Sequence, residues 1–309
     1  MRLMTRWTRD EAAAGCVLAL GAFDGLHIGH RVLMAKAQRI ARERGLTWGV
    51  FTFANHPSTV LTGENGKKRL MGNMERLSVL RDMGCDFVIQ LQFTPALAAM
   101  EAEDFIKHLA QCYNPSHLVV GFNYRFGHRG AGDYHTLKEA GKRYNFTADV
   151  VPPITLGGET VSSTLIRSCI DSGEMQKAGA LLGRPYELRG EVVHGREIGR
   201  TMNLPTANIV PPPSRQLPPR GVYIAQVWTD GVWHTAVTNI GSNPTVAQQG
   251  ALSVESHLLD YKGDLYGRLI RVRFIKKLRG EVKFSGMAQL KAQIEKDVRI
   301  ARAWEGLKI

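Results

Sequence analysis

The chain has 309 residues, of which 44% are hydrophobic and 22% are charged. This composition is typical of a globular protein, and at ~100–200 residues per domain the length predicts two domains. No apolar run approaches the ~20 residues that a membrane-spanning helix needs, and no signal-peptide pattern follows the basic N-terminus. We therefore expect a cytoplasmic protein without a membrane partner. Its cysteines are far apart and form no disulfide or zinc pattern; they are Cys16, Cys85, Cys112 and Cys169.

The charge is positive but diffuse. Forty Lys and Arg residues against 28 Asp and Glu residues give +12. Residues 1–183 carry 21 against 17, or +4, and residues 184–309 carry 19 against 11, or +8. In the densest basic stretch, from Arg268 to Arg279, cations alternate with apolar residues, which indicates the solvated face of a strand. The charge is compatible with polyanionic ligands such as nucleotides.

The first half of the chain alternates strand and helix signals. Short apolar runs predict strands, and apolar residues at helical spacing follow most of them. This alternation predicts a parallel, doubly wound α/β sheet. The expected strands are 16–20, 48–53, 87–91, 117–120 and 148–151, and the expected helices are 29–44, 75–83, 101–112, 134–144, 163–171 and 175–182.

The second half shows short β-branched runs separated by turn residues. Proline pairs and triplets between the runs mark loops that no central strand could hold. We expect a small antiparallel β-barrel with a helix over 287–304 packed against it, and a boundary that makes residues 1–183 and 184–309 the two domains. The expected strands are 191–193, 206–209, 222–227, 233–238, 252–259 and 270–275.

The segment from Gly21 to His30 reads GAFDGLHIGH and stands between the first expected strand and the first expected helix. In an open parallel sheet, ligands bind beyond the carboxyl ends of the strands, and a helix N-terminus attracts phosphate. Gly25 and Gly29 let the backbone approach a ligand closely. His27 and His30 can donate hydrogen bonds to phosphate oxygens whose charge changes as phosphorus is attacked. The segment predicts a nucleotide-phosphate site.

The string GxFDGxHxGH resembles the signature of the nucleotidyltransferase superfamily, which includes class I aminoacyl-tRNA synthetases. Residues 27–30 even spell the synthetase motif HIGH. A synthetase would also carry a lysine-rich KMSKS-type loop and an anticodon-binding region. Neither is present in the sequence, because the stretch GKKR at 66–69 comes too early and lacks the pattern.

Residues 162–167 read SSTLIR near the end of the α/β half. Ser163 and Thr164 stand where they can cap a helix. Hydroxyls and N–H groups at a helix start, with Arg167 one turn later, could equally form a second phosphate clamp. The residues alone leave both interpretations open.

These two motifs, with FANHP at 53–57 and VGFNYRFG at 120–127 between them, resemble the FMN adenylyltransferase module of bacterial bifunctional riboflavin kinase/FAD synthetases. The resemblance implies a Rossmann-like nucleotidyltransferase fold. It also implies that His27 and His30 serve the transferring phosphate and that Asn123 contacts the flavin nucleotide. The ATP site it implies comprises Gly21, Phe23, Asp24, Gly29, Ser163, Thr164 and Arg167.

Residues 195–208 read GREIGRTMNLPTAN, a basic loop that leads into an expected strand. The loop, with Gly195 and Arg200, suits either a flap over a polyphosphate or an exposed turn. Thr206 and Asn208 alternate along the strand, so their side chains face one side together. A hydroxyl and an amide oxygen are hard ligands suited to Mg²⁺.

Glu255 lies near the start of the strand VESHLLD and could act as a general base toward an alcohol or form a salt bridge. The order of LPTAN, GVYIAQV, TNIGSNPT, VESHLLD and DLYG resembles the riboflavin kinase module. The combined resemblance covers about residues 15–303. It implies that Glu255 activates the ribityl 5′-hydroxyl, that Thr206 and Asn208 hold Mg²⁺ and ATP, and that Gly195 and Arg200 bind the ATP phosphates.

Two sequential reactions follow from the resemblance. ATP would phosphorylate riboflavin to FMN, and a second ATP would adenylylate FMN to FAD, with Mg²⁺ as cofactor and no nucleic-acid partner. Two departures from the family pattern are Asn203-Leu204 before PTAN, where Gly-Phe is usual, and Asn55 before His56. Two alternatives stay open: an adenylyl- or cytidylyltransferase of another small phosphate ester with an accessory barrel, and a nucleic-acid-binding module supported only by the +8 charge.

Overall fold

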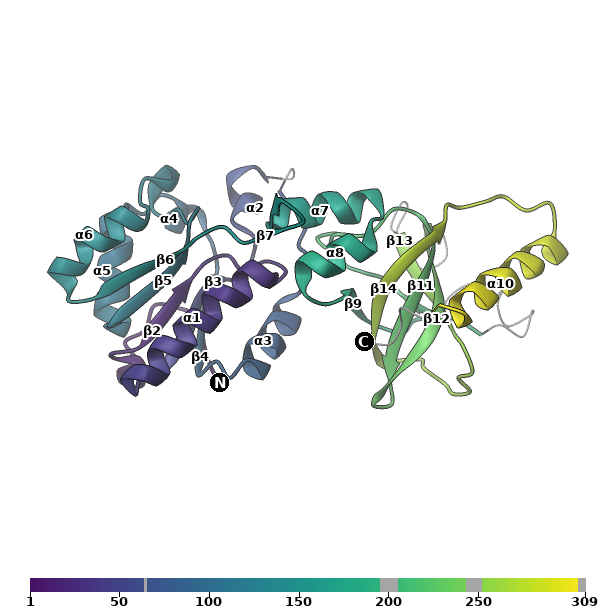
Figure 1. Ribbon diagram of the computed structural model, residues 1–309, viewed down its shortest axis with the longest axis horizontal. Coiled ribbons are helices and arrows are strands. Elements are labelled where there is room, and N and C mark those ends of the chain that lie inside the picture. Colours follow the sequence, from purple (N-terminus) through teal and green to yellow (C-terminus); the bar gives the residue numbers. More distant parts are fainter. Residues whose placement is uncertain (64–65, 195–204, 243–251, 305–309) are drawn as a thin grey trace. The chain divides into compact units, whose positions relative to one another are not determined.

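The computed structural model describes residues 1–63, 66–194, 205–242 and 252–304. Internal contacts divide the chain into two compact units, Met1–Ser163 and Thr164–Ile309. Figure 1 labels most of their helices and strands.

The first unit is built on a parallel sheet, as predicted, which has six strands where five were expected. From β2 the chain adds β3 and β4 on one side of the sheet and then β5 and β6 on the other side, so the direction of winding reverses next to β2. This switch point is where ligands bind in open α/β sheets. In spatial order the strands are β1 (Arg2–Met4), β4 (Phe87–Leu91), β3 (Trp48–Phe53), β2 (Val17–Leu20), β5 (His117–Gly121) and β6 (Thr147–Val151).

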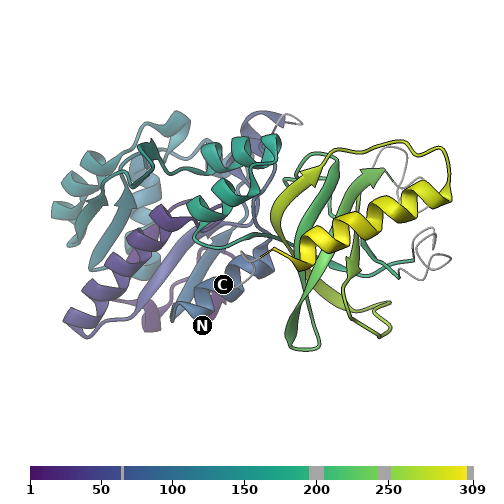
Figure 2. The ribbon, with the colours of Figure 1, turned by 45° about the vertical axis from the view of Figure 1, so that its right-hand side comes forward.

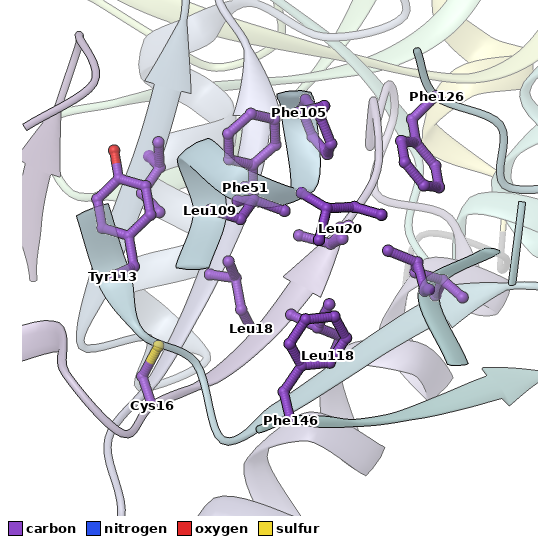
Figure 3. Close-up of a cluster of buried hydrophobic side chains, with 14 of the residues drawn as sticks. Cys16, Leu18, Leu20, Phe51, Phe105, Leu109, Tyr113, Leu118, Phe126 and Phe146 are labelled. Carbon is purple, nitrogen blue, oxygen red and sulfur yellow. The ribbon is translucent and has the colours of Figure 1, made fainter. Parts of the chain in front are cut away.

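Helices cover both faces of this sheet. Side chains alternate along each strand, so Leu18 and Leu20 enter one hydrophobic cluster while Val17 and Ala19 enter the other. Figure 3 shows the first cluster, in which the Phe51 and Phe105 rings meet edge to face at 5.3 Å. The first cluster packs under α5 (Ala102–Tyr113) and α6 (Tyr134–Tyr144), and the second packs under α1 (Ile28–Arg44) and α3 (Asn73–Asp82).

Several short elements have no counterpart among the sequence predictions. The edge strand β1 pairs in parallel with β4 through three residues. The others are η1 (Glu11–Ala13), α2 (Pro57–Leu61), α4 (Pro95–Ala98), η3 (His128–Gly130), and the hairpin of β7 (Thr155–Leu156) and β8 (Glu159–Thr160).

The second unit is the expected antiparallel barrel. Its six strands form one sheet, and a backbone hydrogen bond of 2.8 Å from Val193 N–H to the Asn208 carbonyl joins the two edges. This bridge brings the two edges of the barrel sheet together at one point. In order the strands are β10 (Ala207–Ile209), β13 (Leu252–Leu258), β12 (Val232–Ser242), β11 (Gly221–Thr229), β14 (Leu269–Arg279) and β9 (Tyr186–Glu191).

Three helices accompany the barrel. α10 (Met287–Arg302) lies across its strands (Figure 2) and buries Ala301 against a cluster that includes Ile224 and Val237. α7 (Ser163–Ser172) and α8 (Met175–Leu182) precede the barrel, and α8 contacts β9 and β14. These contacts place α8 in the second compact unit, so the structural division comes before the expected boundary at residue 183.

The basic stretch in β14 alternates as a strand should, but its cations are paired. Arg271 Nε lies 2.6 Å from one carboxylate oxygen of Glu187, and Arg273 Nε lies 3.2 Å from the other. The Arg273 guanidinium also lies 3.7 Å from the ring centroid of Trp233. The face of β14 that we expected to be solvated is therefore half-buried, and its arginines contact other residues of the barrel.

Candidate active sites

The loop after β2 has an unusual backbone. Phe23 and Leu26 adopt left-handed conformations, with φ of 50° and 43°, and Gly25 between them has φ of 81°. Such conformations are uncommon for residues with a side chain and accumulate at functional sites. A Cβ at Gly21 would stand 2.8 Å from the Phe23 ring. Glycine at position 21 therefore lets the Phe23 ring fold back against the end of β2.

The two histidines of this loop are held against each other. The Nδ1 atom of His27, the N-cap of α1, accepts a hydrogen bond of 3.3 Å from the His30 N–H. The two rings stack with centroids 3.5 Å apart, and His30 meets the Phe23 ring edge-on at 5.2 Å. Because Nδ1 of His27 accepts, a neutral His27 ring carries its proton on Nε2 and can donate only from that atom.

A cleft of about 950 Å³ opens at the carboxyl ends of the strands in the first unit. Its volume suits a nucleotide and a second ligand. Six of the predicted site residues line it, namely Gly21, Phe23, Asp24, His30, Asn123 and Ser163. His27 lies behind this lining at 6% exposure, and Gly29 lies in the first turn of α1, where a Cβ would come 3.2 Å from the His27 ring.

Ser163 connects the start of α7 to the same loop. Its hydroxyl donates to the backbone carbonyl of Asp24 over 2.9 Å. The Asp24 carboxylate, itself buried, accepts from the Leu70 N–H at 3.0 and 3.1 Å. Asp24 thus organises the loop through both its backbone and its side chain. Thr164 follows Ser163 in α7, and Arg167 lies one turn further along that helix.

Three cations on the cleft wall were not among the predicted site residues. Lys67, Arg125 and Arg129 all line it and give it positive charge suited to phosphates. Lys67 belongs to the GKKR stretch, and both arginines belong to or follow the VGFNYRFG stretch. The signal was therefore present in the sequence, but only the fold shows that these stretches face one cleft.

Much of the cleft lining is apolar. Aromatic and aliphatic side chains from four separate segments line it, and a flat ring system could pack on such a surface. The Asn55 amide fixes one of these segments, since it donates to the Phe93 carbonyl at 2.9 Å and accepts from the Phe93 N–H at 2.8 Å. The apolar lining comprises Phe53, Leu61, Phe93, Leu97, Met100, Phe105, Tyr124 and Phe126.

The second unit holds a separate constellation. The Thr206 hydroxyl donates to the Glu255 carboxylate over 2.7 Å. Asn208 and Glu255 are opposed in the β10–β13 register, so their side chains share one face of the barrel. Asn208 is only 4% exposed, and within the described ranges its Oδ1 atom has no hydrogen-bond partner. A buried acceptor without a donor is available to coordinate a cation or accept from a ligand.

Thr206 and Asn208 line a cavity of about 390 Å³ in this unit. Tyr266, stacked on His194 with ring centroids 3.9 Å apart, and Lys262 also border it. The expected phosphate ligands Gly195 and Arg200, and the departure at Asn203-Leu204, lie outside the described residues.

Known protein families match both halves of the chain. The FAD synthetase family matches residues 9–165, and the riboflavin kinase family matches residues 182–305. The bifunctional riboflavin kinase/FMN adenylyltransferase of Escherichia coli K12 is 40% identical over 299 residues, covering 95% of this chain and 94% of that protein. The chain belongs to the bifunctional riboflavin kinase/FMN adenylyltransferase family.

Another relative and a solved structure are similar to the chain over nearly its whole length. The Bacillus subtilis protein of the same name is 35% identical over 292 residues, covering 93% of this chain and 92% of its own length. A crystal structure from Streptococcus pneumoniae, titled as a macrolide-efflux protein, is 29% identical with a TM-score of 0.88, covering 99% of this chain and 100% of that one. In this chain, none of the helices in the described ranges is long and apolar enough to cross a membrane.

The family supports the bifunctional enzyme over a transferase of another phosphate ester with an accessory barrel. The chain is a transferase with both activities: its N-terminal part is an FAD synthetase domain and its C-terminal part is a riboflavin kinase domain. ATP is the co-substrate of both reactions. Riboflavin is the substrate of the kinase, and FMN is the substrate of the adenylyltransferase.

Proposed function

We infer that residues 1–183 form the adenylyltransferase domain and residues 184–309 the kinase domain, each with the site described above. One observation supports this assignment: the two candidate cavities are lined by separate sets of residues, one before residue 183 and one after it, and each lining has chemistry suited to one reaction. The riboflavin kinase match begins at residue 182, next to this boundary, and the FAD synthetase match ends before it, at residue 165.

In the first site, a phosphate oxygen of FMN attacks the α-phosphorus of ATP. The bond from that phosphorus to the α,β-bridging oxygen breaks, and pyrophosphate leaves with the electron pair. No base is needed, because the FMN phosphate is already anionic at neutral pH. His27 and His30 donate to oxygens of the reacting phosphate, where such donors matter most, and Asn123 contacts the flavin nucleotide.

The ATP in this site is held from several directions. The backbone from Gly21 to Asp24 and Gly29 at the start of α1 approach its phosphates, where the positive end of the helix dipole favours anions. Ser163, Thr164 and Arg167 supply hydroxyls and a guanidinium from α7.

In the second site, Glu255 takes the proton of the ribityl 5′-hydroxyl as that oxygen attacks the γ-phosphorus of ATP. The bond from the γ-phosphorus to the β,γ-bridging oxygen breaks, and ADP leaves. The 2.7 Å hydrogen bond from Thr206 orients the Glu255 carboxylate before substrate binds, which supports a base that must be positioned. Gly195 and Arg200 bind ATP phosphates in this proposal.

The donor set of the second site fits Mg²⁺. The Thr206 hydroxyl and the buried, unpartnered Asn208 Oδ1 are hard oxygen donors, and Mg²⁺ is commonly held by one or two protein oxygens together with substrate phosphates. When bound, the ion would neutralise charge on the ATP phosphates.

We place the reactions in the cytoplasm, with small molecules as the partners and no nucleic acid. The support is that the four cysteines are free thiols and three of them are buried, as is usual in a reducing compartment.

Replacing Asn208 by Leu tests the metal assignment, because leucine keeps the approximate volume and removes the oxygen. FMN formation should then require at least about tenfold more Mg²⁺. FAD formation from supplied FMN, measured in the same preparation, should keep its Mg²⁺ dependence. Unchanged Mg²⁺ dependence of FMN formation would contradict the assignment.

A further inference from the structure

Arg76 is a buried cation behind the cleft of the first unit. It lies in α3 and is only 3% exposed. Its NH1 group donates to the Ala22 carbonyl over 3.0 Å, and its NH2 group donates to the Phe53 carbonyl over 2.5 Å. One guanidinium therefore joins the chain just after β2 to the end of β3.

Both of these backbone segments face the proposed ATP site. Ala22 and Phe53 line the cleft, whereas Arg76 does not. The Ala22 carbonyl also accepts from the Thr52 hydroxyl over 2.9 Å. Position 22 lies between Gly21 and Phe23, both assigned above to ATP binding. Arg76 thus holds the wall of the site from the side away from the ligand.

A second layer fixes the guanidinium itself. The Asn73 Oδ1 atom accepts from Arg76 NH2 at 3.1 Å and from Arg69 NH2 at 2.6 Å. Arg69 NH1 in turn donates to the Ala54 carbonyl over 2.9 Å. Two arginines and one amide therefore hold three carbonyls at the ends of two neighbouring strands.

Packing alone would not favour a charged side chain at this buried position. Moving an ion out of water costs several kcal/mol even after relaxation, and an apolar side chain of similar size is often at least as stable. Burial lowers the pKa of Arg76 to about 10, with nearby Asp24 favouring the charged form. The group therefore stays protonated at neutral pH. What an arginine gives here, and an apolar residue cannot, is two donors in a fixed fork.

We propose that Arg76 is a positioning residue for adenylyl transfer, which sets the backbone of Ala22 and Phe53 in the geometry that the reacting phosphate requires. The proposal rests on the placement of adenylyl transfer in this cleft. It assigns Arg76 no contact with substrate, so its removal should act on the reaction step more than on binding.

The test compares full-length Arg76→Met and Arg76→Lys with Arg81→Met, which removes an exposed arginine from the same helix. In Arg76→Met, kcat for FAD formation from FMN should fall about 100-fold, as expected for a misplacement near 1 Å. KM for ATP and FMN should change less than about threefold. Riboflavin phosphorylation by the same protein should stay unchanged, and an unchanged melting temperature and circular-dichroism spectrum report that the first unit, which contains Arg76, is folded.

Arg76→Lys separates geometry from charge. Lysine keeps the positive charge but lacks the planar fork, so kcat should stay at least about tenfold below that of the unchanged protein. Full activity of Arg76→Lys, or a lowered melting temperature of Arg76→Met with unchanged kcat, would overturn the proposal. His30→Ala is assayed in parallel. If His30→Ala still forms FAD, the assignment of adenylyl transfer to this cleft is wrong. If His30→Ala loses FAD formation while the Arg76 variants keep it, only the role of Arg76 is refuted.

Discussion

His27 and His30 show how one side chain can have structural and chemical roles together. The Nδ1 atom of His27 caps α1, and its ring stacks on His30. Removing His27 would therefore remove a helix cap, worth ~1 kcal/mol, as well as a donor. His30 uses its backbone N–H for this cap and lines the cleft with its ring. Its side chain is therefore the cleaner probe of the chemistry.

For this reason we expect His30→Ala to reduce FAD formation from FMN by about 10²–10³-fold, the typical effect of losing one donor to a developing charge. Riboflavin phosphorylation should be unaffected. Flavins separated by chromatography after incubation with FMN and ATP give the measurement. His135→Ala, an exposed histidine in α6, is the matched control, and equal losses in the two variants would refute the role of His30.

Glu255→Gln examines the kinase base. A glutamine can still accept the hydrogen bond from Thr206, but it cannot take a proton from the substrate hydroxyl. FMN formation from riboflavin should fall about 10²–10⁴-fold, while FAD formation from FMN continues. The exposed Glu295→Gln on α10 controls for the charge change. Activity of Glu255→Gln within a few-fold of the control would mean that another group accepts the proton.

At the scale of elements, α10 is fixed to the barrel by a buried ion pair. Arg279 at the end of β14 donates from Nε and NH2 to Asp297 at 3.0 and 2.8 Å, and Gln293 adds a bond of 2.9 Å to the same carboxylate. The Asp297 side chain is 3% exposed. Removing one partner of such a pair leaves the other charge poorly solvated.

Asp297→Ala should therefore destabilise the barrel by about 3 kcal/mol. Glu295→Ala changes an exposed carboxylate on the same helix and should cost less than about 0.5 kcal/mol. Urea unfolding followed by circular dichroism measures both. Equal midpoints for the two variants would show that the Arg279 pair contributes no net stability.

The long elements could be predicted from sequence because each carries its own apolar period. The run 134–144 is an example, since the helix spans the same residues in the structure. Short elements such as β1 and α4 carry too few residues for a period and form because a partner is nearby. β1, for instance, pairs with β4 through three residues.

Site residues could likewise be predicted where the signal is local in the sequence, and not where it depends on the fold. The Gly21–His30 segment is informative by itself, since strand, glycines and histidines are adjacent in the chain. Lys67 and Arg129 belong to segments distant from it and meet it only after folding. Arg76 has no local signal, because a cation inside a helix normally faces solvent. Its contacts with Ala22 and Phe53 arise from the topology of the sheet.

For the whole molecule, the product of the second site is the substrate of the first. The two candidate cavities are lined by separate sets of residues, so a chain that lacks one activity should still supply the other. FMN made by one molecule should then reach the adenylyltransferase cleft of another through solution.

The most direct test gives riboflavin, ATP and Mg²⁺ to His30→Ala, to Glu255→Gln and to an equimolar mixture of both proteins, and separates the flavins by chromatography. We predict that His30→Ala stops at FMN, that Glu255→Gln leaves riboflavin unchanged, and that the mixture forms FAD. A folded single variant that loses both reactions, or a mixture of folded variants that forms no FAD, would contradict the assignment of two independent sites.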